Sequence, residues 1–437
     1  MYNFIKSVTP RLFKDWVIKS KSEFKNSQWN KKRLFKRMQV KHAELLQQLK
    51  GKKKIKVVFL AIHKSVWKVD PVFKKMLEDP FFEPTILICP YTNYGDERMW
   101  QDMEEAYEYF EEKGYPVLSS YNKEQERWLT LDEIRPDIVF FTNPHNLTRK
   151  EYYEDAYLNY LSCYVPYHHE VGSFGNNDSQ HNQVFHNAIW KIFSAHNDSF
   201  LLAKDCAVSK GKNILISGFP AMENLIQLKN NRNFIDVWKT NDGRKRIIWS
   251  PHHLINETVN QSNFLEYAKF FLKASKKHKN EIVWAFKPHP ILKSKLLEHP
   301  KWGKEKTEEY YNYWAEQEYT QLELGNYENL FLSSDAMIHD CGSFLAEYMY
   351  TEKPVMYLLN KKHKGQFFNP FGKKALNSCK IGMSETDIEN FISNIASHKI
   401  DYILDNHKKF IKENIEPYFS KNLPSQFIIE TLKEVSI

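Results

Sequence analysis

Short apolar runs alternate with amphipathic stretches from residue 55 to about residue 400, and this alternation constrains the fold more than any other feature. Val57–Ile62, Thr85–Cys89 and Asp137–Phe141 have the length and composition of buried strands. Met99–Lys113 has helical spacing and is followed by Gly114, a residue that typically ends a helix. Strands and helices in alternation form parallel sheets covered by helices on both faces. The sequence therefore predicts an α/β fold.

The chain is long enough for two such domains. Its 437 residues exceed one ordinary core, and the polar segment 228–245 separates two stretches with the same pattern. We expect two doubly wound, Rossmann-like domains over residues 55–230 and 245–400, followed by C-terminal helices over residues 401–437. The remaining elements expected are strands at 163–166, 213–217, 246–250, 282–286, 337–339 and 355–359, and helices at 72–78, 184–193, 263–276, 344–350 and 387–396.

The first 54 residues carry most of the positive charge. Sixteen lysines and arginines stand against three acidic residues there, a balance of +13, while the rest of the chain has a net charge of −5. Apolar residues recur among the lysines at near-helical spacing, which predicts a basic helical arm over residues 1–54. Such an arm suits an anionic membrane surface, or it packs on the body with a solvated basic face. The acidic body argues against nucleic acid as a partner.

Cysteine use and hydropathy indicate the compartment. Five cysteines are scattered without a CxxC pair, which is typical of a reducing environment. There is no apolar run long enough for a transmembrane span, and no signal-peptide core at the N-terminus. We expect a cytoplasmic protein that is peripheral on the inner face of the plasma membrane.

The common nucleotide, metalloprotease and hydrolase motifs are absent, as is an Asp-x-Asp pair, so candidate chemistry lies at the ends of predicted strands. The first such segment contains His168 and His169, and imidazoles suit proton transfer near neutral pH. Either one is the candidate base, with His186 as the next candidate. Cys163 and the nearby histidines lack the spacing of paired zinc ligands, so we predict no metal site.

The second segment is Lys287-Pro288-His289-Pro290, which follows the strand at 282–286. Its two prolines restrict the backbone and hold His289 in a stiff loop, as a pre-organised phosphate contact requires. The third segment runs from Ser334 through Asp340, Gly342 and Ser343 to Glu347. A helix beginning near Ser343 would offer backbone N–H groups to an anion. Glu347 would receive ribose hydroxyls.

These segments resemble the CDP-glycerol glycerophosphotransferase family over roughly residues 160–360. The run from Ser334 to Glu347 is similar to the family's nucleotide segment, and the Lys287–Pro290 segment is similar to its second-domain histidine motif. Gly218-Phe219-Pro220 is similar to its interdomain Gly-aromatic-Pro. The chain departs from the family at Tyr167-His168-His169, where members commonly carry Trp-His-Gly.

The resemblance implies a GT-B-type transferase and its reaction. Glycerol phosphate, or a related alditol phosphate, would pass from a CDP-linked donor to a hydroxyl of a cell-wall or capsule polymer or its lipid-linked precursor, releasing CMP. It implies no cofactor besides the donor substrate CDP-glycerol, with His168 or His169 as base and His289 at the diphosphate. The donor-binding residues expected are Lys287, Ser334, Asp340, Gly342, Ser343 and Glu347.

Three alternatives follow from the same residues. A GT-B glycosyltransferase with a nucleotide-sugar donor shares the fold and nucleotide pocket. A nucleic-acid-binding protein would use the basic arm, and a non-catalytic scaffold for wall assembly would turn over no nucleotide. Nucleotide release from different donors separates the first and third of these alternatives from the phosphotransferase.

Overall fold

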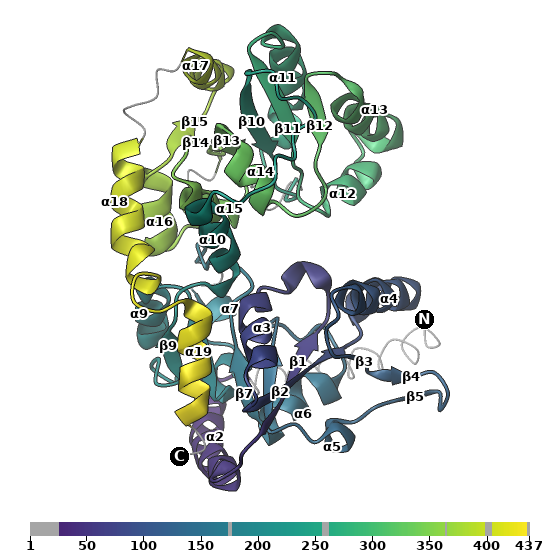
Figure 1. Ribbon diagram of the computed structural model, residues 1–437, viewed down its shortest axis with the longest axis vertical. Coiled ribbons are helices and arrows are strands. Elements are labelled where there is room, and N and C mark those ends of the chain that lie inside the picture. Colours follow the sequence, from purple (N-terminus) through teal and green to yellow (C-terminus); the bar gives the residue numbers. More distant parts are fainter. Residues whose placement is uncertain (1–25, 174–176, 256–261, 363–364, 398–403, 435–437) are drawn as a thin grey trace, which may run out of the picture. The chain divides into compact units, whose positions relative to one another are not determined.

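The computed structural model describes residues 26–173, 177–255, 262–362, 365–397 and 404–434. The chain divides into two compact units. Unit 1 comprises Met1–His168, Phe174–Ala221 and Asn422–Ile437, and unit 2 comprises His169–Ser173 and Met222–Lys421. In Figure 1 each unit shows a parallel sheet with helices packed around it.

Among the described residues of unit 1, seven parallel strands form one sheet in the order β3-β2-β1-β6-β7-β8-β9. The sheet strands are β1 (Ile55–Ala61), β2 (Phe82–Ile88), β3 (Val117–Ser119), β6 (Ile138–Phe141), β7 (Leu161–Tyr164), β8 (Lys191–Ser194) and β9 (Ile214–Ile216), and a separate antiparallel pair consists of β4 (Tyr121–Asn122) and β5 (Arg127–Trp128). The helices are α2 (Gln28–Leu49), α3 (Asp70–Glu78), α4 (Asp96–Glu112), α5 (Leu131–Ile134), α6 (Glu154–Asn159), α7 (Asp178–His181), α8 (Val184–Ala188), α9 (Asn197–Cys206) and α19 (Pro424–Lys433).

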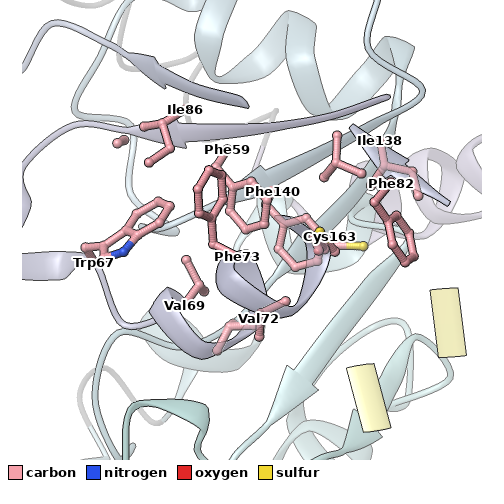
Figure 2. Packing of buried hydrophobic residues seen from close by; sticks show 14 of the residues in the cluster. Phe59, Trp67, Val69, Val72, Phe73, Phe82, Ile86, Ile138, Phe140 and Cys163 are labelled. Atoms are coloured by element: carbon pink, nitrogen blue, oxygen red, sulfur yellow. The ribbon is translucent and has the colours of Figure 1, made fainter. Parts of the chain in front are cut away.

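Aromatic side chains pack together within the largely aliphatic core of unit 1 on one face of the sheet (Figure 2). The ring of Phe59 on β1 stacks on Phe140 of β6 with centroids 4.6 Å apart, and Phe73 of α3 meets it edge-on at 5.2 Å. Burying one such side chain contributes about 1.5–3 kcal/mol. The last helix, α19, adds Ile428 and Leu432 to this cluster, so the end of the chain is part of the core of unit 1.

Unit 2 has a six-stranded parallel sheet among its described residues, in the order β12-β11-β10-β13-β14-β15. The strands are β10 (Lys245–Ser250), β11 (Ile282–Phe286), β12 (Thr320–Leu322), β13 (Ala336–His339), β14 (Val355–Leu358) and β15 (Lys380–Gly382). The helices are α10 (Glu223–Asn231), α11 (Phe264–Lys277), α12 (Leu292–Glu298), α13 (Gly303–Glu316), α14 (Glu328–Ser333), α15 (Phe344–Glu347), α16 (Pro370–Asn377), α17 (Glu385–Ala396) and α18 (Leu404–Asn414).

Two tryptophans, one on a strand and one on a helix, pack against phenylalanines in the core of unit 2. Trp249 of β10 stacks on Phe271 of α11 with centroids 3.9 Å apart, and Phe286 of β11 stacks on Trp314 of α13 at 5.3 Å. In both sheets the first strand in sequence lies in the interior, and the strand order reverses beside it. This order is that of a Rossmann-like sheet, in which ligands bind at the carboxyl ends of the strands where the order reverses. The predicted fold class is confirmed.

One predicted helix is wrong over half its length. Residues 184–193 were expected to be helical, but α8 ends at Ala188 and β8 begins at Lys191. The side-chain amide of Asn213 donates to the carbonyls of His186 and Ile189 at 2.8 and 3.0 Å. These bonds satisfy carbonyls that the end of the helix leaves open. A short apolar run does not distinguish a buried strand from a helix, which explains the error.

The polar segment 228–245 is not a linker, because it packs within unit 2. Its first residues complete α10, and Trp238 is buried with its indole N–H donating to the Ser333 hydroxyl at 3.1 Å. The backbone N–H of Lys239 donates to the Gln321 side chain at 2.9 Å. The chain instead passes from unit 1 to unit 2 at Ala221–Met222, and it also crosses between the units at His168–His169, Ser173–Phe174 and Lys421–Asn422.

The described part of the basic arm is α2, which packs on unit 1 through α8. Met38 and Leu49 are buried, while Lys32, Lys36 and Arg37 are exposed. α2 therefore packs on unit 1, as the second reading of the arm expected, and its exposed basic face is also what the first reading requires, while residues 1–25 lie outside the described residues. No helix in the described ranges is both long and apolar enough to cross a membrane.

Candidate active site

Two strand ends in unit 2 carry histidines and are tied together by backbone hydrogen bonds. Pro251-His252-His253 follows β10, and Lys287-Pro288-His289 follows β11. The N–H of Lys287 donates to the carbonyl of Trp249 at 2.8 Å, and the N–H of His289 donates to the carbonyl of Pro251 at 3.1 Å. The parallel pairing of the strands thus continues into the loops, which fixes the two loops against each other.

The rings of His252, His253 and His289 form a cluster at this edge. The ring centroid of His253 lies 4.2 Å from that of His252 and 4.0 Å from that of His289. The centroids of His252 and His289 are 5.3 Å apart. Burial, then the His289 ring and the Lys295 ammonium, lowers the pKa of His252 to about 3. Burial and then Lys295 lowers the pKa of His289 to about 4, and the pKa of His253 falls further below its ordinary value. All three rings are therefore neutral at pH 7.

Sequence reasoning found His289 but missed His252 and His253. Pro251-His252 directly follows the predicted strand 246–250, much as Pro288-His289 follows the predicted strand 282–286 after Lys287, although no second proline follows His252. Applied to every strand end, the same criterion would have found the whole cluster.

Asp340 follows β13 and organises the neighbouring loops. It is 1% exposed, and its carboxylate accepts the backbone N–H groups of His252 and Asn263 and the hydroxyl of Ser262. Burial raises the pKa of Asp340 to about 6, although these donors oppose the shift. Asp340 was expected to bind the donor, but its oxygens are used to hold the chain segment that carries His252.

Three further predicted donor-binding side chains are buried and bonded within unit 2. The Lys287 ammonium donates to the carbonyl of Gly325 at 2.7 Å. The Ser334 hydroxyl donates to the carbonyl of Phe331 and shares a hydrogen bond with the Tyr348 hydroxyl, both at 2.8 Å. Glu347 is 1% exposed on α15, and the Tyr327 hydroxyl donates to its carboxylate. Because they are buried and bonded within unit 2, these side chains support the loops at the sheet edge.

Gly342 and Ser343 are half-buried between β13 and α15. A Cβ atom at Gly342 would meet Val171 at 3.6 Å, an ordinary contact, so no described neighbour requires a glycine there. Ser343 makes no capping hydrogen bond in the described structure, and α15 is only four residues long before a 3-10 turn. The predicted helix start is present, but neither Asp340 nor Ser343 caps it.

The two candidate bases differ sharply in environment. His169 is 1% exposed in unit 2, shares a hydrogen bond of 3.2 Å with the Tyr350 hydroxyl and stacks on Phe371 with centroids 5.6 Å apart. His168 belongs to unit 1 and is half-buried, with the ring of Tyr167 edge-on at 4.5 Å. Of the two imidazoles, His168 is therefore the more accessible.

Other histidines of unit 1 surround or support this segment. His145 follows β6, and burial together with His168 lowers the pKa of His145. The ring of His186 is buried and its Nδ1 accepts the backbone N–H of Gln183 at 3.2 Å, which caps α8. Burial holds the pKa of His186 well below its ordinary value. His186, the expected substitute base, therefore has a capping role.

Comparisons with known proteins agree with this architecture. A variant of the wall teichoic acid polymerase TagF superposes with a TM-score of 0.58 at 14% identity, covering 97% of this chain and 97% of that chain. S. aureus MnaA with UDP gives 0.54 at 14% identity, covering 88% and 96%. UDP-GlcNAc 2-epimerase from Neisseria meningitidis bound to UDP-GlcNAc gives 0.51 at 14%, covering 87% and 100%. A direct sequence search matched no curated protein.

Two Rossmann-like units with these strand orders define a fold of the GT-B class, which the structural likenesses share. The sequence profile of CDP-glycerol:poly(glycerophosphate) glycerophosphotransferases matches residues 173–398, just over half of the chain. The chain belongs to that family, as the sequence resemblance implied, and it is a transferase of the CDP-glycerol glycerophosphotransferase type.

Proposed function

We propose that the chain transfers glycerol phosphate, or a related alditol phosphate, from CDP-glycerol or its analogue to a hydroxyl of a cell-wall or capsule polymer or its lipid-linked precursor. The observation that carries this proposal is the family match over residues 173–398, which covers the described strand ends of unit 2. A TagF structure described with CDPG superposes with a TM-score of 0.56.

The reaction is a phosphoryl transfer. The acceptor oxygen attacks the β-phosphorus of the donor and forms a new P–O bond. The bond from that phosphorus to the bridging oxygen breaks, and CMP leaves with the bridging oxygen and its electron pair. The acceptor hydroxyl loses its proton to a base. Positioning and charge stabilisation supply most of the rate enhancement in such transfers.

His168 is the base in this scheme, because it is the accessible one of the paired imidazoles. His169 holds the segment in place through Tyr350 and Phe371. A histidine acting as a general base contributes about 10²–10⁴-fold to the rate. The scheme uses no cofactor besides the donor.

The donor lies at the strand ends of unit 2, with Gly342, Ser343 and His289 as its direct contacts. Lys287, Ser334, Asp340 and Glu347 support these contacts from buried positions. The predicted residues thus have two roles: the half-buried ones contact the donor, and the buried ones hold the contacting loops in place.

Turnover of defined donors tests the proposal. Purified chain is incubated with CDP-glycerol and a poly(glycerol phosphate) primer, and CMP release and primer extension are measured together. Both should occur at matched rates. Hydrolysis of CDP-glycerol without primer growth, or turnover of UDP-sugars alone, would contradict the proposal and favour the glycosyltransferase.

The second part of the proposal concerns the membrane. The exposed basic residues of α2, with the balance of +13 over residues 1–54, support binding to an anionic membrane surface, where the lipid-linked acceptor resides. A cytoplasmic, peripheral location follows from this proposal, and vesicle binding tests it.

A further inference from the structure

The three-histidine cluster of His252, His253 and His289 has a defined protonation pattern. Nδ1 of His252 accepts the backbone N–H of Leu254 at 3.3 Å, and Nδ1 of His289 accepts that of Ile291 at 3.4 Å. A neutral imidazole carries one proton, so in both rings it lies on Nε2. Each ring therefore presents an N–H donor on the side away from its own backbone.

The third ring adds an unused polar atom. Nδ1 of His253 is buried and has no hydrogen-bond partner among the described residues. Buried polar atoms are nearly always satisfied, so an orphan in a cluster of donors points to a bound group.

The charges around the cluster are positive. The Lys295 ammonium on α12 lowers the pKa of all three rings, and Lys287 also lowers that of His289. Within the part of the chain that the structure describes, no carboxylate raises the pKa of these rings. Nearby positive charge in a poorly solvated place favours an anion.

A divalent metal ion fits the cluster less well, although the ring nitrogens lie within 4.8 Å of one another. Metal ligation requires unprotonated nitrogens. In His252 and His289 one ring nitrogen is occupied by a backbone amide and the other carries the proton. The Lys295 ammonium would also repel a cation.

We propose that His252, His253 and His289, together with the Lys295 ammonium, bind the phosphoryl oxygens of a nucleoside diphosphate. The identity of that nucleotide as a cytidine derivative rests on the proposed function. The cluster follows β10 and β11, next to the reversal of strand order between β10 and β13, where ligands of such sheets bind. His252, His253 and Lys295 are thus added to the donor site.

Proton uptake on binding follows from this arrangement. The charged groups that face the rings are Lys295 of α12 and Lys287 of the β11 loop, while Asp340, after β13, accepts the backbone N–H of His252. A bound diphosphate offsets the positive charge and raises the pKa of the rings towards its ordinary value. The affinity for diphosphate therefore rises as the pH falls from 7.5 to 6.0.

Calorimetric titration of the full chain with CDP, pyrophosphate and cytidine tests the proposal, at both pH values and in buffers of different ionisation enthalpy. His252→Asn and His289→Asn keep an acceptor near the Nδ1 position and remove Nε2. Lys295→Met removes the charge without touching either loop, which guards against misfolding of a loop variant. His299→Asn is the matched control, because Nδ1 of His299 accepts the N–H of Lys301 at 3.3 Å in the same way.

We expect the wild type to take up protons with CDP and to bind it more tightly at pH 6.0, by up to about fourfold for each ring whose pKa reaches its ordinary value. Each of the three cluster variants should lose about tenfold or more in affinity for CDP and pyrophosphate, as for one charge-assisted hydrogen bond. Their affinity for cytidine should be unchanged, and the control should behave as the wild type.

Unchanged CDP affinity in all three variants would overturn the proposal. The proposal would also be overturned if the wild type bound zinc stoichiometrically and the variants lost that zinc binding while they still bound CDP. CMP release from CDP-glycerol by the wild type would leave the proposed function standing in either case. Conversely, loss of CDP affinity in the variants without CMP release by the wild type would support the cluster and refute the proposed function.

Discussion

The neutral histidines of unit 2 make its stability depend on pH, and His289→Asn isolates one of them. The folded chain holds the pKa of His289 at about 4, against an ordinary value of 6.5. As the pH falls below 6.5, the unfolded chain binds a proton that the folded chain does not, so stability present at pH 7.5 is lost. This one ring lowers the free energy of unfolding by about 2 kcal/mol at pH 5.0 relative to pH 7.5.

Between pH 7.5 and 5.0 the free energy of unfolding of unit 2 should therefore fall by about 2 kcal/mol less in His289→Asn than in the wild type. Asparagine does not titrate, and its side-chain oxygen still accepts the N–H of Ile291. Peptide-resolved hydrogen exchange over β10 and β11 measures the opening free energy of unit 2 directly, without assuming that the two units unfold together. Measurements at pH 8.5 and 7.5 give the baseline. An equal loss between pH 7.5 and 5.0 in variant and wild type would refute the assigned protonation state.

Three further predictions follow from the proposed roles. His168→Ala should lower CMP release by about 10²–10⁴-fold with CDP affinity kept, whereas His169→Ala should mainly destabilise unit 2 by about 1–3 kcal/mol; similar turnover in His168→Ala and wild type would remove it as the base. Ser343→Ala should raise the donor KM by several-fold through one lost hydrogen bond, measured at low CDP-glycerol concentration, and an unchanged KM would place the donor elsewhere. Lys36→Glu combined with Arg37→Glu should weaken binding to anionic vesicles by about 1 kcal/mol or more per charge, while turnover on a soluble primer stays constant; unchanged co-sedimentation would contradict the membrane role of α2.

Much of the fold could be predicted because buried parallel strands are short, continuous apolar runs. The expected strand 282–286 coincides with β11, and the predicted helix before Gly114 is α4, with Gly114 at a φ of +69°. The error at 184–193 arose because a short apolar run is compatible with either a buried strand or a helix. The polar segment 228–245 was misread because one buried residue, Trp238, outweighs its hydrophilic neighbours.

The candidate site was predicted at the level of segments but not of side chains. Strand ends drew attention to Lys287 and Asp340, yet sequence does not show whether a side chain points to solvent or into its own unit. Both proved to be bonded within unit 2. His168 and His169 could not be separated for the same reason, since consecutive residues after a strand point in different directions.

The most direct test of the account is the donor specificity of the purified chain. CDP-glycerol, UDP-GlcNAc and UDP-glucose are each supplied with the same poly(glycerol phosphate) primer, and nucleotide release is followed alongside the mass of the primer. The account predicts CMP release from CDP-glycerol, with one glycerol phosphate added to the primer for each CMP. Sugar addition from a UDP donor with no turnover of CDP-glycerol would contradict it.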